Sequence, residues 1–341
     1  MLKAAVLYGK KNIKIEEVDL PANQDNIMIK IAACGICMSD VKAYQEGQGY
    51  YFKPPAILGH EYVGTVAKIP NKNEDFKKGD RVAVIHAVNC GYCNYCKRGS
   101  FELCKNKQRA SNGGFAEYVS IKEKFAKIAL LKIPEKLSTN EATFLEPVAC
   151  CIETLEKCNI KLGDTVVIIG AGVMGLLLLQ LSLLSGASKV IVSEIGKYRR
   201  DIAKSFGAVA VNPRKVNLGK FIMKETDSEG ADLIITTVLK ESIIQENLSF
   251  ARKQGTLFIF GSAISKPEII LNSNRIHYDQ IKIIGTSTYK PFHFNVALKL
   301  LKENRISVTP LITSVEPLKN IAGALDNYIK PENLKIIIEC E

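Results

Sequence analysis

The sequence lacks any long uninterrupted run of hydrophobic residues. Its longest apolar stretch, Val173 to Leu184, is interrupted by Gln180 and Ser182 and is shorter than the roughly 20 residues that cross a bilayer. The segment from Met1 to Lys10 also lacks the apolar run and the small-residue cleavage site of a signal peptide. We therefore expect a cytoplasmic protein without a membrane partner.

The sequence also lacks clusters of like charge. Lysine and arginine outnumber the acidic residues by 46 to 35, which gives a formal net charge of +11. The lysines are scattered, however, and never form a run of about five or six. We therefore expect no nucleic-acid partner, and interpret the charge as a generally basic surface whose field attracts anionic cofactors and substrates.

The composition is that of an ordinary globular protein, with 47% hydrophobic and 24% charged residues in a chain of 341. That length predicts two domains, and no internal repeat is visible. The first 150 residues consist of short apolar segments separated by turns rich in Gly, Pro and Asn. They predict a β-rich domain over residues 1–150, with strands at Ala4–Tyr8, Ile27–Ala33, Glu61–Ile69, Arg81–Ile85 and Phe115–Ile121.

The pattern changes near Ser138. The segment Ser138-Thr-Asn-Glu141 is a capping box and predicts a helix that continues through Glu146–Cys158. From Thr165 onward, continuous apolar strands alternate with helical segments, which indicates a parallel sheet covered by helices on both faces. The predicted strands are Thr165–Gly170, Lys189–Ser193, Asp232–Thr237 and Thr256–Phe260, and the predicted helices are Val173–Leu184, Tyr198–Phe206 and Ile243–Arg252.

These elements predict an α/β fold with a doubly wound parallel sheet over residues 151–275. After Ile276 the pattern loosens. A helix at Pro291–Glu303 and a closing strand at Lys335–Glu339 then predict that residues 276–341 return to the first domain.

A glycine-rich turn, Gly170-Ala-Gly-Val-Met-Gly175, joins the first of these strands to its helix. Its glycines allow a tight turn, close approach of a pyrophosphate and close packing of helix on strand, and the helix N-terminus attracts phosphate. A second strand ends at Glu194, whose carboxylate suits the hydroxyls of a ribose. The expected dinucleotide-binding residues are Gly170, Gly172, Val173, Met174, Gly175, Glu194 and Arg199.

The choice between NAD and NADP depends on the residues around Glu194. Its carboxylate repels a 2′-phosphate, whereas Lys197, Arg199 and Arg200 could attract one. We expect Arg199 to pack over the adenine instead, and therefore expect NAD rather than NADP.

Ten cysteines are present, and four of them lie between Cys90 and Cys104 at the spacing C-x2-C-x2-C-x7-C. Four thiolates at Cys90, Cys93, Cys96 and Cys104 form a closed tetrahedral set, which is how a structural zinc is held. An iron–sulfur cluster also accepts four cysteines, but the surrounding glycine-rich turns and the lack of a second cysteine cluster favour zinc. In the cytosol such cysteines favour metal ligation over disulfides.

A second, dispersed set of metal-binding residue types comprises Cys37, His60, Glu61 and Glu146. One thiolate, one imidazole and a carboxylate leave an open position on a metal, as catalytic zinc requires. Spacing alone does not choose between Cys34 and Cys37, because either could be a small buried residue. Two other histidines, His86 and His293, are expected to be satisfied surface or core residues.

The order of these motifs decides between the alternatives. Five segments follow one another in this order: Cys34-Gly-Ile-Cys-Met-Ser-Asp40, Gly59-His-Glu61, Cys90 to Cys104, Glu146-Pro147 and the glycine-rich turn. The segments Gly113–Tyr118 and Ile276–Tyr278 add to the pattern. Together the chain resembles the zinc-dependent medium-chain dehydrogenases, most closely the sorbitol, galactitol and threonine dehydrogenase branch. The resemblance covers nearly the whole chain and implies a GroES-like catalytic domain with a zinc lobe, followed by a Rossmann domain.

The resemblance also implies roles for individual residues. Cys37 and His60 would bind a catalytic zinc, with Glu61 as third ligand, and Glu146 would bind the zinc or its water. Ser39 would relay a proton, and Asp40 would support the ligands. Two zinc ions per chain and a homodimer or homotetramer are expected, with the subunit contact near Leu257–Phe260 and Ile269–Leu271.

The expected reaction is hydride transfer from a secondary hydroxyl of a small polar alcohol, with a polyol or sugar alcohol as the substrate class. The sequence departs from the sorbitol pattern at Met38, at Lys42-Ala43 and at Thr288, so sorbitol itself is in doubt. The alternatives are a threonine or other amino-alcohol dehydrogenase and, more remotely, a zinc-lobed nucleic-acid-binding protein.

Overall fold

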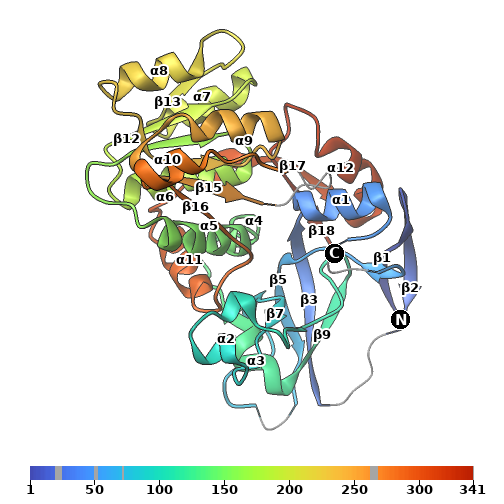
Figure 1. The fold of residues 1–341 in the computed structure, drawn as a ribbon. Helices are drawn as coiled ribbons and strands as arrows, with labels where there is room; N and C mark the ends of the chain where they lie inside the picture. The colour runs from blue at the N-terminus through green and yellow to red at the C-terminus, as the bar shows by residue number, and fades with distance from the viewer. Residues whose placement is uncertain (20–24, 50–52, 71–72, 262–267, 341) are drawn as a thin grey trace. The chain divides into compact units, whose positions relative to one another are not determined.

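The chain forms two compact structural units. The computed structural model describes residues 1–19, 25–49, 53–70, 73–261 and 268–340 (Figure 1). Unit 1 consists of Met1–Ala149 together with Tyr289–Glu341, and unit 2 consists of Cys150–Thr288. Among the described helices, none has the length and apolar character needed to span a bilayer.

Unit 1 is built on a mixed sheet with the strand order β10-β6-β5-β3-β18-β17, in which β9 also pairs with β3. Two smaller sheets accompany it, β2-β1-β4 and β7-β8. The strands are β1 (Leu2–Gly9), β2 (Asn12–Val18), β3 (Asn26–Gly35), β4 (Ala56–Ile57), β5 (Glu61–Lys68), β6 (Arg81–Val84), β7 (Ala87–Val88), β8 (Gln108–Arg109), β9 (Tyr118–Lys122), β10 (Leu130–Lys132), β17 (Ile312–Pro317) and β18 (Lys335–Glu339).

The helices of unit 1 are short and lie around these sheets. They are α1 (Met38–Glu46), α2 (Asn94–Lys97), α3 (Ala126–Ala129), α4 (Thr139–Ala142), α11 (His293–Lys302) and α12 (Ile321–Asn327). Helix α5 (Leu145–Cys158) continues from unit 1 into unit 2.

The centre of unit 1 is strand β3, where alternate residues face the core. Ile27, Ile29 and Ile31 are fully buried, whereas the residues between them are partly exposed, which is the pattern of a strand with one face on a core. The C-terminal strand β18 pairs with β3 in antiparallel register, Ile338 opposite Cys34. Figure 1 shows the red β18 beside the blue β3, so the closing strand belongs to the same sheet as β3.

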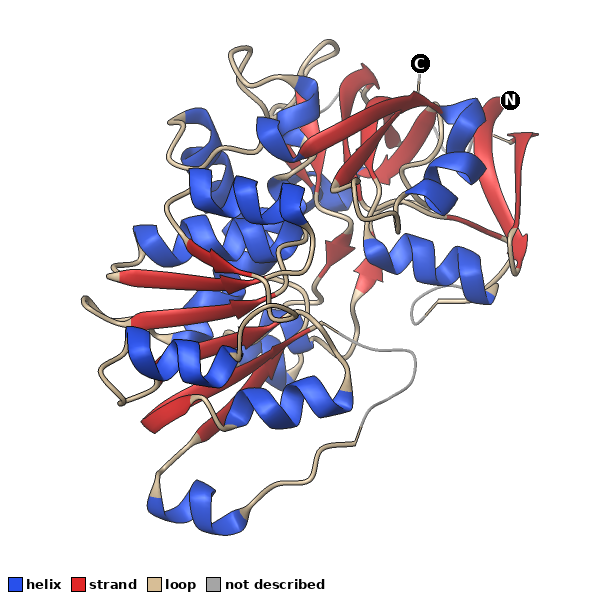
Figure 2. Cartoon of the chain, turned by 90° about the horizontal axis from the view of Figure 1, so that it is seen from above, coloured by secondary structure: helices blue, strands red, loops and turns tan. Residues whose placement is uncertain are grey.

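Unit 2 is a six-stranded parallel sheet with the order β13-β12-β11-β14-β15-β16. Its strands are β11 (Thr165–Ile169), β12 (Lys189–Ser193), β13 (Val209–Val211), β14 (Ala231–Thr236), β15 (Ala251–Phe260) and β16 (Lys282–Thr286), and its helices are α6 (Val173–Leu184), α7 (Lys197–Ser205), α8 (Leu218–Glu225), α9 (Glu241–Leu248) and α10 (Ser273–Tyr278). Figure 2 shows helices on both faces of these strands. The order reverses at β11, the point where doubly wound sheets bind ligands, and the predicted parallel sheet is confirmed.

The third predicted segment begins later than expected. Residues 276–288 belong to unit 2, because β16 pairs with β15 along its whole length. The return to unit 1 therefore starts at Tyr289 rather than at Ile276. The sequence analysis did not predict β16, because its lysine and glycine weaken the apolar pattern of the strand.

The same pairing corrects the expected subunit contact. Strand β15, which contains Leu257–Phe260, is hydrogen-bonded to β14 on one side and to β16 on the other, so it has no free edge to offer a partner. The edges of the sheet are β13 and β16. Residues Ile269–Leu271 have no regular secondary structure.

Two predicted helices also differ from the structure. The helix expected from Ser138 through Cys158 is divided into α4 and α5, and Pro147, which has no N–H to donate, lies in the first turn of α5, where a proline is tolerated. The capping box at Ser138 is present, with the Glu141 N–H donating to the Ser138 hydroxyl at 3.2 Å. The helix expected over Ile243–Arg252 ends at Leu248, and Arg252 lies in β15, paired with Asp232.

Candidate metal and cofactor sites

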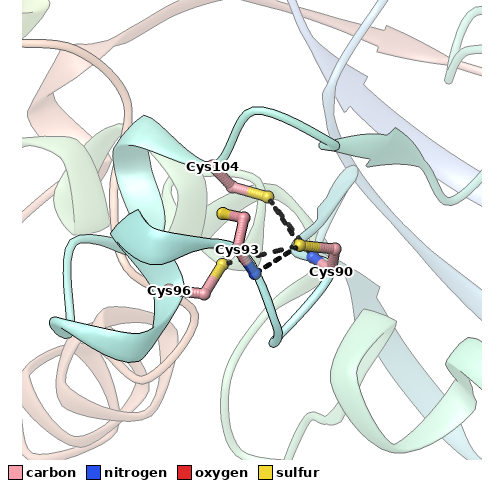
Figure 3. Close-up of side chains that lie close together, drawn as sticks. All are labelled: Cys90, Cys93, Cys96 and Cys104. Atoms are coloured by element: carbon pink, nitrogen blue, oxygen red, sulfur yellow. Dashed lines mark hydrogen bonds between the residues drawn. The ribbon is translucent and has the colours of Figure 1, made fainter.

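The four clustered cysteines face one another in a single lobe of unit 1. The sulfur atoms of Cys90, Cys93, Cys96 and Cys104 all lie within 4.8 Å of one another, and Figure 3 shows the four side chains converging. Cys93 is the N-cap of the short helix α2, which carries Cys96. The sulfur of Cys104 lies 3.6 Å from that of Cys90, and the Cys90 N–H donates to Cys104 at 3.3 Å.

The polar environment of the lobe favours thiolates at some positions. Backbone N–H groups of Cys96 and Lys105 lower the pKa of Cys93 to about 6, whereas burial raises the pKa of Cys96 to about 12. Each of the ten cysteines is free of disulfides. Four convergent sulfurs with no other donor type among them fit a closed, tetrahedral zinc site.

A second cluster lies where β3 and β5 run side by side. Cys37 is the N-cap of α1, two residues beyond the end of β3, and His60 and Glu61 stand at the start of β5. The register places Gly35 opposite Glu61, which brings the three side chains together. Their ligand atoms lie within 4.8 Å of one another, and one sulfur, one nitrogen and one oxygen donor fit a zinc ion with an open position.

Asp40, the third residue of α1, holds this cluster in place. It is fully buried and accepts hydrogen bonds from the N–H groups of Cys37 at 3.0 Å and Gly59 at 3.1 Å. Its Oδ1 also lies 3.5 Å from Nδ1 of His60. A carboxylate on one ring nitrogen orients a histidine so that the other nitrogen is left for a metal.

Asp40 and His60 each stabilise the charged form of the other, so that the pKa of Asp40 is lowered and that of His60 is raised. Burial acts to lower the pKa of His60, but the charges of Asp40 and Cys37 and the hydrogen bonds to both side chains together outweigh it and raise that pKa well above its ordinary value.

Glu61 has a partner that the sequence did not reveal. The side chains of Glu61 and Lys335 are 2% and 1% exposed and form a buried ion pair. Lys335 Nζ also donates to the Ile36 carbonyl at 3.1 Å and lies 5.5 Å from the centre of the Phe144 ring. The sequence did offer a signal for this pair: Lys335 begins the otherwise apolar strand β18, and a lysine is seldom buried without a partner.

The other residues predicted for this site are not among the three whose ligand atoms converge within 4.8 Å. Glu146 is the second residue of α5 and partly buried; among the described residues, the metal-binding group contains Cys37, His60 and Glu61 but not Glu146. Ser39 is exposed in the first turn of α1. Cys34 is buried and its thiol points to the Gly35 carbonyl, so Cys37, not Cys34, joins the cluster.

His86 was expected to have its hydrogen bonds satisfied, and the structure differs from this prediction at Nδ1. Its ring centre lies 5.9 Å from that of His60, with the two planes at 49°. Within the described ranges its Nδ1 is shielded from solvent and has no hydrogen-bond partner. Burial, and then the charge of His60, lower the pKa of His86 to about 3, so the ring is neutral.

The glycine-rich turn of unit 2 has the geometry that its sequence predicts. Gly170 has a φ of +99°, which disfavours any residue with a side chain. A Cβ on Gly175 would collide with the Gly170 carbonyl oxygen, whereas a Cβ on Gly172 would meet nothing within 4 Å. Gly172 is the N-cap of α6, followed by Val173 and Met174, so open space lies at the helix N-terminus, where a pyrophosphate binds.

Glu194 lies at the end of β12 beside this turn. It is 8% exposed, and its carboxylate accepts hydrogen bonds from the N–H groups of Ala171 at 2.8 Å and Gly196 at 2.7 Å. Arg200 donates to the carbonyls of Glu194 and Ile195. Arg199 is partly buried in α7.

Comparison with known proteins identifies the family of the chain. Residues 23–135 match the family model of the alcohol dehydrogenase GroES-like domain, and residues 173–303 match that of zinc-binding dehydrogenases. The chain belongs to the zinc-dependent medium-chain alcohol and polyol dehydrogenases. It is therefore an oxidoreductase that acts on CH–OH groups with zinc and a nicotinamide cofactor, and the expected GroES-like and Rossmann folds are confirmed.

Individual relatives extend over the whole chain. It is 32% identical to sorbitol dehydrogenase of Bacillus subtilis (strain 168), over 99% of this chain and 97% of the relative. It is also 32% identical to D-arabitol-phosphate dehydrogenase of Enterococcus avium, over 93% and 91% of the two chains. A zinc-binding dehydrogenase from Sinorhizobium meliloti 1021, solved with NADP bound, matches the fold with a TM-score of 0.90 at 29% identity, covering 99% of each chain.

The ion pair between Glu61 and Lys335 predicts a large effect on stability. In the zinc-free protein, Lys335→Met leaves the buried Glu61 carboxylate without a partner, and we expect it to lower the free energy of unfolding by about 3–5 kcal/mol. The double variant Lys335→Met/Glu61→Gln should recover most of that loss, because no unpaired charge remains. Urea unfolding followed by circular dichroism measures both; a double variant no more stable than Lys335→Met would contradict this account.

The second and third glycines of the turn, Gly172 and Gly175, predict effects on two different properties, dinucleotide binding and stability. Gly175→Ala forces the helix away from the strand and should lower the free energy of unfolding by about 1–3 kcal/mol. Gly172→Ala should leave stability within about 0.5 kcal/mol of the wild type, yet weaken dinucleotide binding because the methyl group occupies the space for the pyrophosphate. Calorimetric titration with NADH, beside thermal unfolding, separates the two; unchanged NADH affinity in a folded Gly172→Ala would be the contrary result.

Proposed function

We propose that this chain is a zinc-dependent, NAD-linked dehydrogenase that oxidises a secondary hydroxyl of a polyol or sugar alcohol. The observation that carries the proposal is the cluster of Cys37, His60 and Glu61, held by Asp40 and Lys335. Two relatives that cover the chain are named for sorbitol and for arabitol phosphate, which supports a polyhydroxylated substrate.

Two zinc ions are proposed, each with its own donor set. Cys37 and His60 would hold the catalytic ion, with Glu61 and Glu146 as the carboxylates available to it. The open position of such a site is what a substrate oxygen needs. Cys90, Cys93, Cys96 and Cys104 would hold the second ion, whose closed set of four sulfurs leaves no position for a substrate and gives it a structural role.

The side chains around the catalytic cluster would position the substrate and move its proton. Bound zinc would supply a Lewis acid and the nicotinamide a hydride acceptor. Asp40 fixes the orientation of His60, and Lys335 neutralises Glu61, so both ligand side chains are held before the substrate arrives. Ser39 Oγ would take the proton of the substrate hydroxyl and, being exposed, pass it to solvent.

NAD is proposed over NADP. The Glu194 carboxylate is fixed by two backbone N–H groups at the end of β12, and its charge would repel a 2′-phosphate. Arg200 is committed to backbone carbonyls, which leaves Arg199 to pack on the adenine. Gly170, Gly172, Val173, Met174 and Gly175 would receive the pyrophosphate.

We further propose a homodimer or homotetramer in the cytoplasm. Strand β16 is an edge of the sheet in unit 2, and its unpaired backbone groups can continue the sheet into a second copy. Ten cysteines without a disulfide suit a reducing compartment.

The experiment is a substrate panel with the zinc-loaded protein and either NAD or NADP. It contains sorbitol, arabitol, arabitol phosphate, butane-2,3-diol, butan-2-ol and threonine. We expect reduced cofactor, followed by its absorbance, with NAD and at least one polyol. Turnover of threonine alone would identify an amino-alcohol dehydrogenase instead, and inactivity on every alcohol with zinc and cofactor bound would contradict the polyol proposal.

Cys37→Ala tests the catalytic ligand. It should lower kcat by about a thousandfold or more, because the thiolate ligand is lost, while the circular dichroism spectrum stays unchanged. Cys34→Ala is the matched control, since this neighbouring thiol lies outside the cluster, and it should keep activity within about threefold of the wild type. Comparable activity in the two variants would overturn the assignment.

A further inference from the structure

In the sequence, His86 lies between His60 of the catalytic cluster and Cys90 of the four-cysteine lobe. It follows β6, and Cys90 is four positions further along the chain. Its backbone is anchored, because its carbonyl accepts a hydrogen bond from the Ala110 N–H at 2.8 Å and the preceding Ile85 N–H donates to the Ala129 carbonyl at 2.7 Å. The location of this ring is therefore set by the sheet and does not depend on a mobile loop.

The ring of His86 lies beside the histidine that would hold the zinc. Its centre is 5.9 Å from that of His60, and the 49° angle between the planes excludes parallel stacking. Asp40 lies against Nδ1 of His60, so the other nitrogen of His60 is the one available to a metal. A substrate whose reacting oxygen lies at that metal would have its neighbouring atoms close to His86.

His86 has hydrogen-bonding capacity that the described residues do not use. A neutral imidazole has one donor and one acceptor nitrogen, yet Nδ1 has neither a partner nor solvent. Burying a polar atom in this way is unfavourable unless a partner arrives. The residue is partly exposed, and a half turn of the ring exchanges Nδ1 with Cδ2, since this terminal torsion is broad and roughly two-fold.

We infer that His86 is a substrate-binding residue that hydrogen-bonds the hydroxyl on the carbon next to the reacting one. This inference rests on the proposed function and adds to it a reason for preferring polyols over simple alcohols. A site that uses a buried polar group to bind a substrate hydroxyl discriminates against an analogue that lacks it, because the polar group is then left unpaired. A monohydroxy alcohol would leave Nδ1 of His86 without a hydrogen-bond partner among the described residues.

The test compares butane-2,3-diol with butan-2-ol, which differ by the one hydroxyl in question. The wild-type enzyme should have the higher kcat/KM on the diol. His86→Phe keeps the size and planarity of the ring but cannot hydrogen-bond. It should lower kcat/KM on the diol by about tenfold, equivalent to about 1.4 kcal/mol, and leave that on butan-2-ol within about twofold.

A second variant separates hydrogen bonding from packing. His86→Gln retains a donor and an acceptor and should recover part of the preference for the diol, even though it fills the space less well. An equal loss on both alcohols in His86→Phe, or no loss on either, would overturn the inference while the proposed function stands. A wild-type enzyme that oxidises no alcohol of the panel would overturn the proposed function, and the inference with it.

Discussion

The buried ion pair between Glu61 and Lys335 is the constraint on which the arrangement of unit 1 depends. A charge taken out of water must be paired, and here the partner comes from the last strand of the chain. Strand β18 can deliver Lys335 only by pairing with β3, and the same register leads from β3 to Cys37. The pairing that closes the sheet therefore also brings Lys335 to Glu61 in the metal-binding cluster.

Asp40 is the second buried carboxylate that supports the cluster, and it holds Cys37 and His60. It joins the N-terminus of α1, the loop before β5 and the ring of His60 by contacts to Cys37, Gly59 and His60. The cluster is thus supported by two buried carboxylates, one paired with a lysine and one with backbone N–H groups and an imidazole. In unit 2 the turn depends on glycines for three different reasons: Gly170 has a positive φ, a side chain on Gly175 would collide with the Gly170 carbonyl, and Gly172 leaves open space at the N-terminus of α6.

What the residues alone could predict was local, whereas the dispersed set of Cys37, His60 and Glu61 was predicted from the family resemblance. The helix Val173–Leu184 and the strand Lys189–Ser193 were predicted to the residue, because glycine turns and continuous apolar runs mark their ends. The four-cysteine lobe was predicted from spacing, since its ligands are close in sequence. The ion pair of Lys335 with Glu61 was not predicted, because the two residues are 274 positions apart and the pairing of β18 with β3 depends on long-range register. The prediction that His86 is a satisfied residue is wrong for its Nδ1, because the sequence does not show which polar atoms lack partners.

The most direct test of the two-site account is the zinc content of the purified protein, measured by mass spectrometry together with X-ray absorption at the zinc edge. We expect about two zinc ions per chain, one with sulfur ligands alone and one with mixed sulfur, nitrogen and oxygen ligands. In His60→Ala the mixed component should disappear and about one all-sulfur zinc should remain. A wild-type protein with a single kind of zinc site, or a His60→Ala variant that keeps the mixed site, would contradict the account.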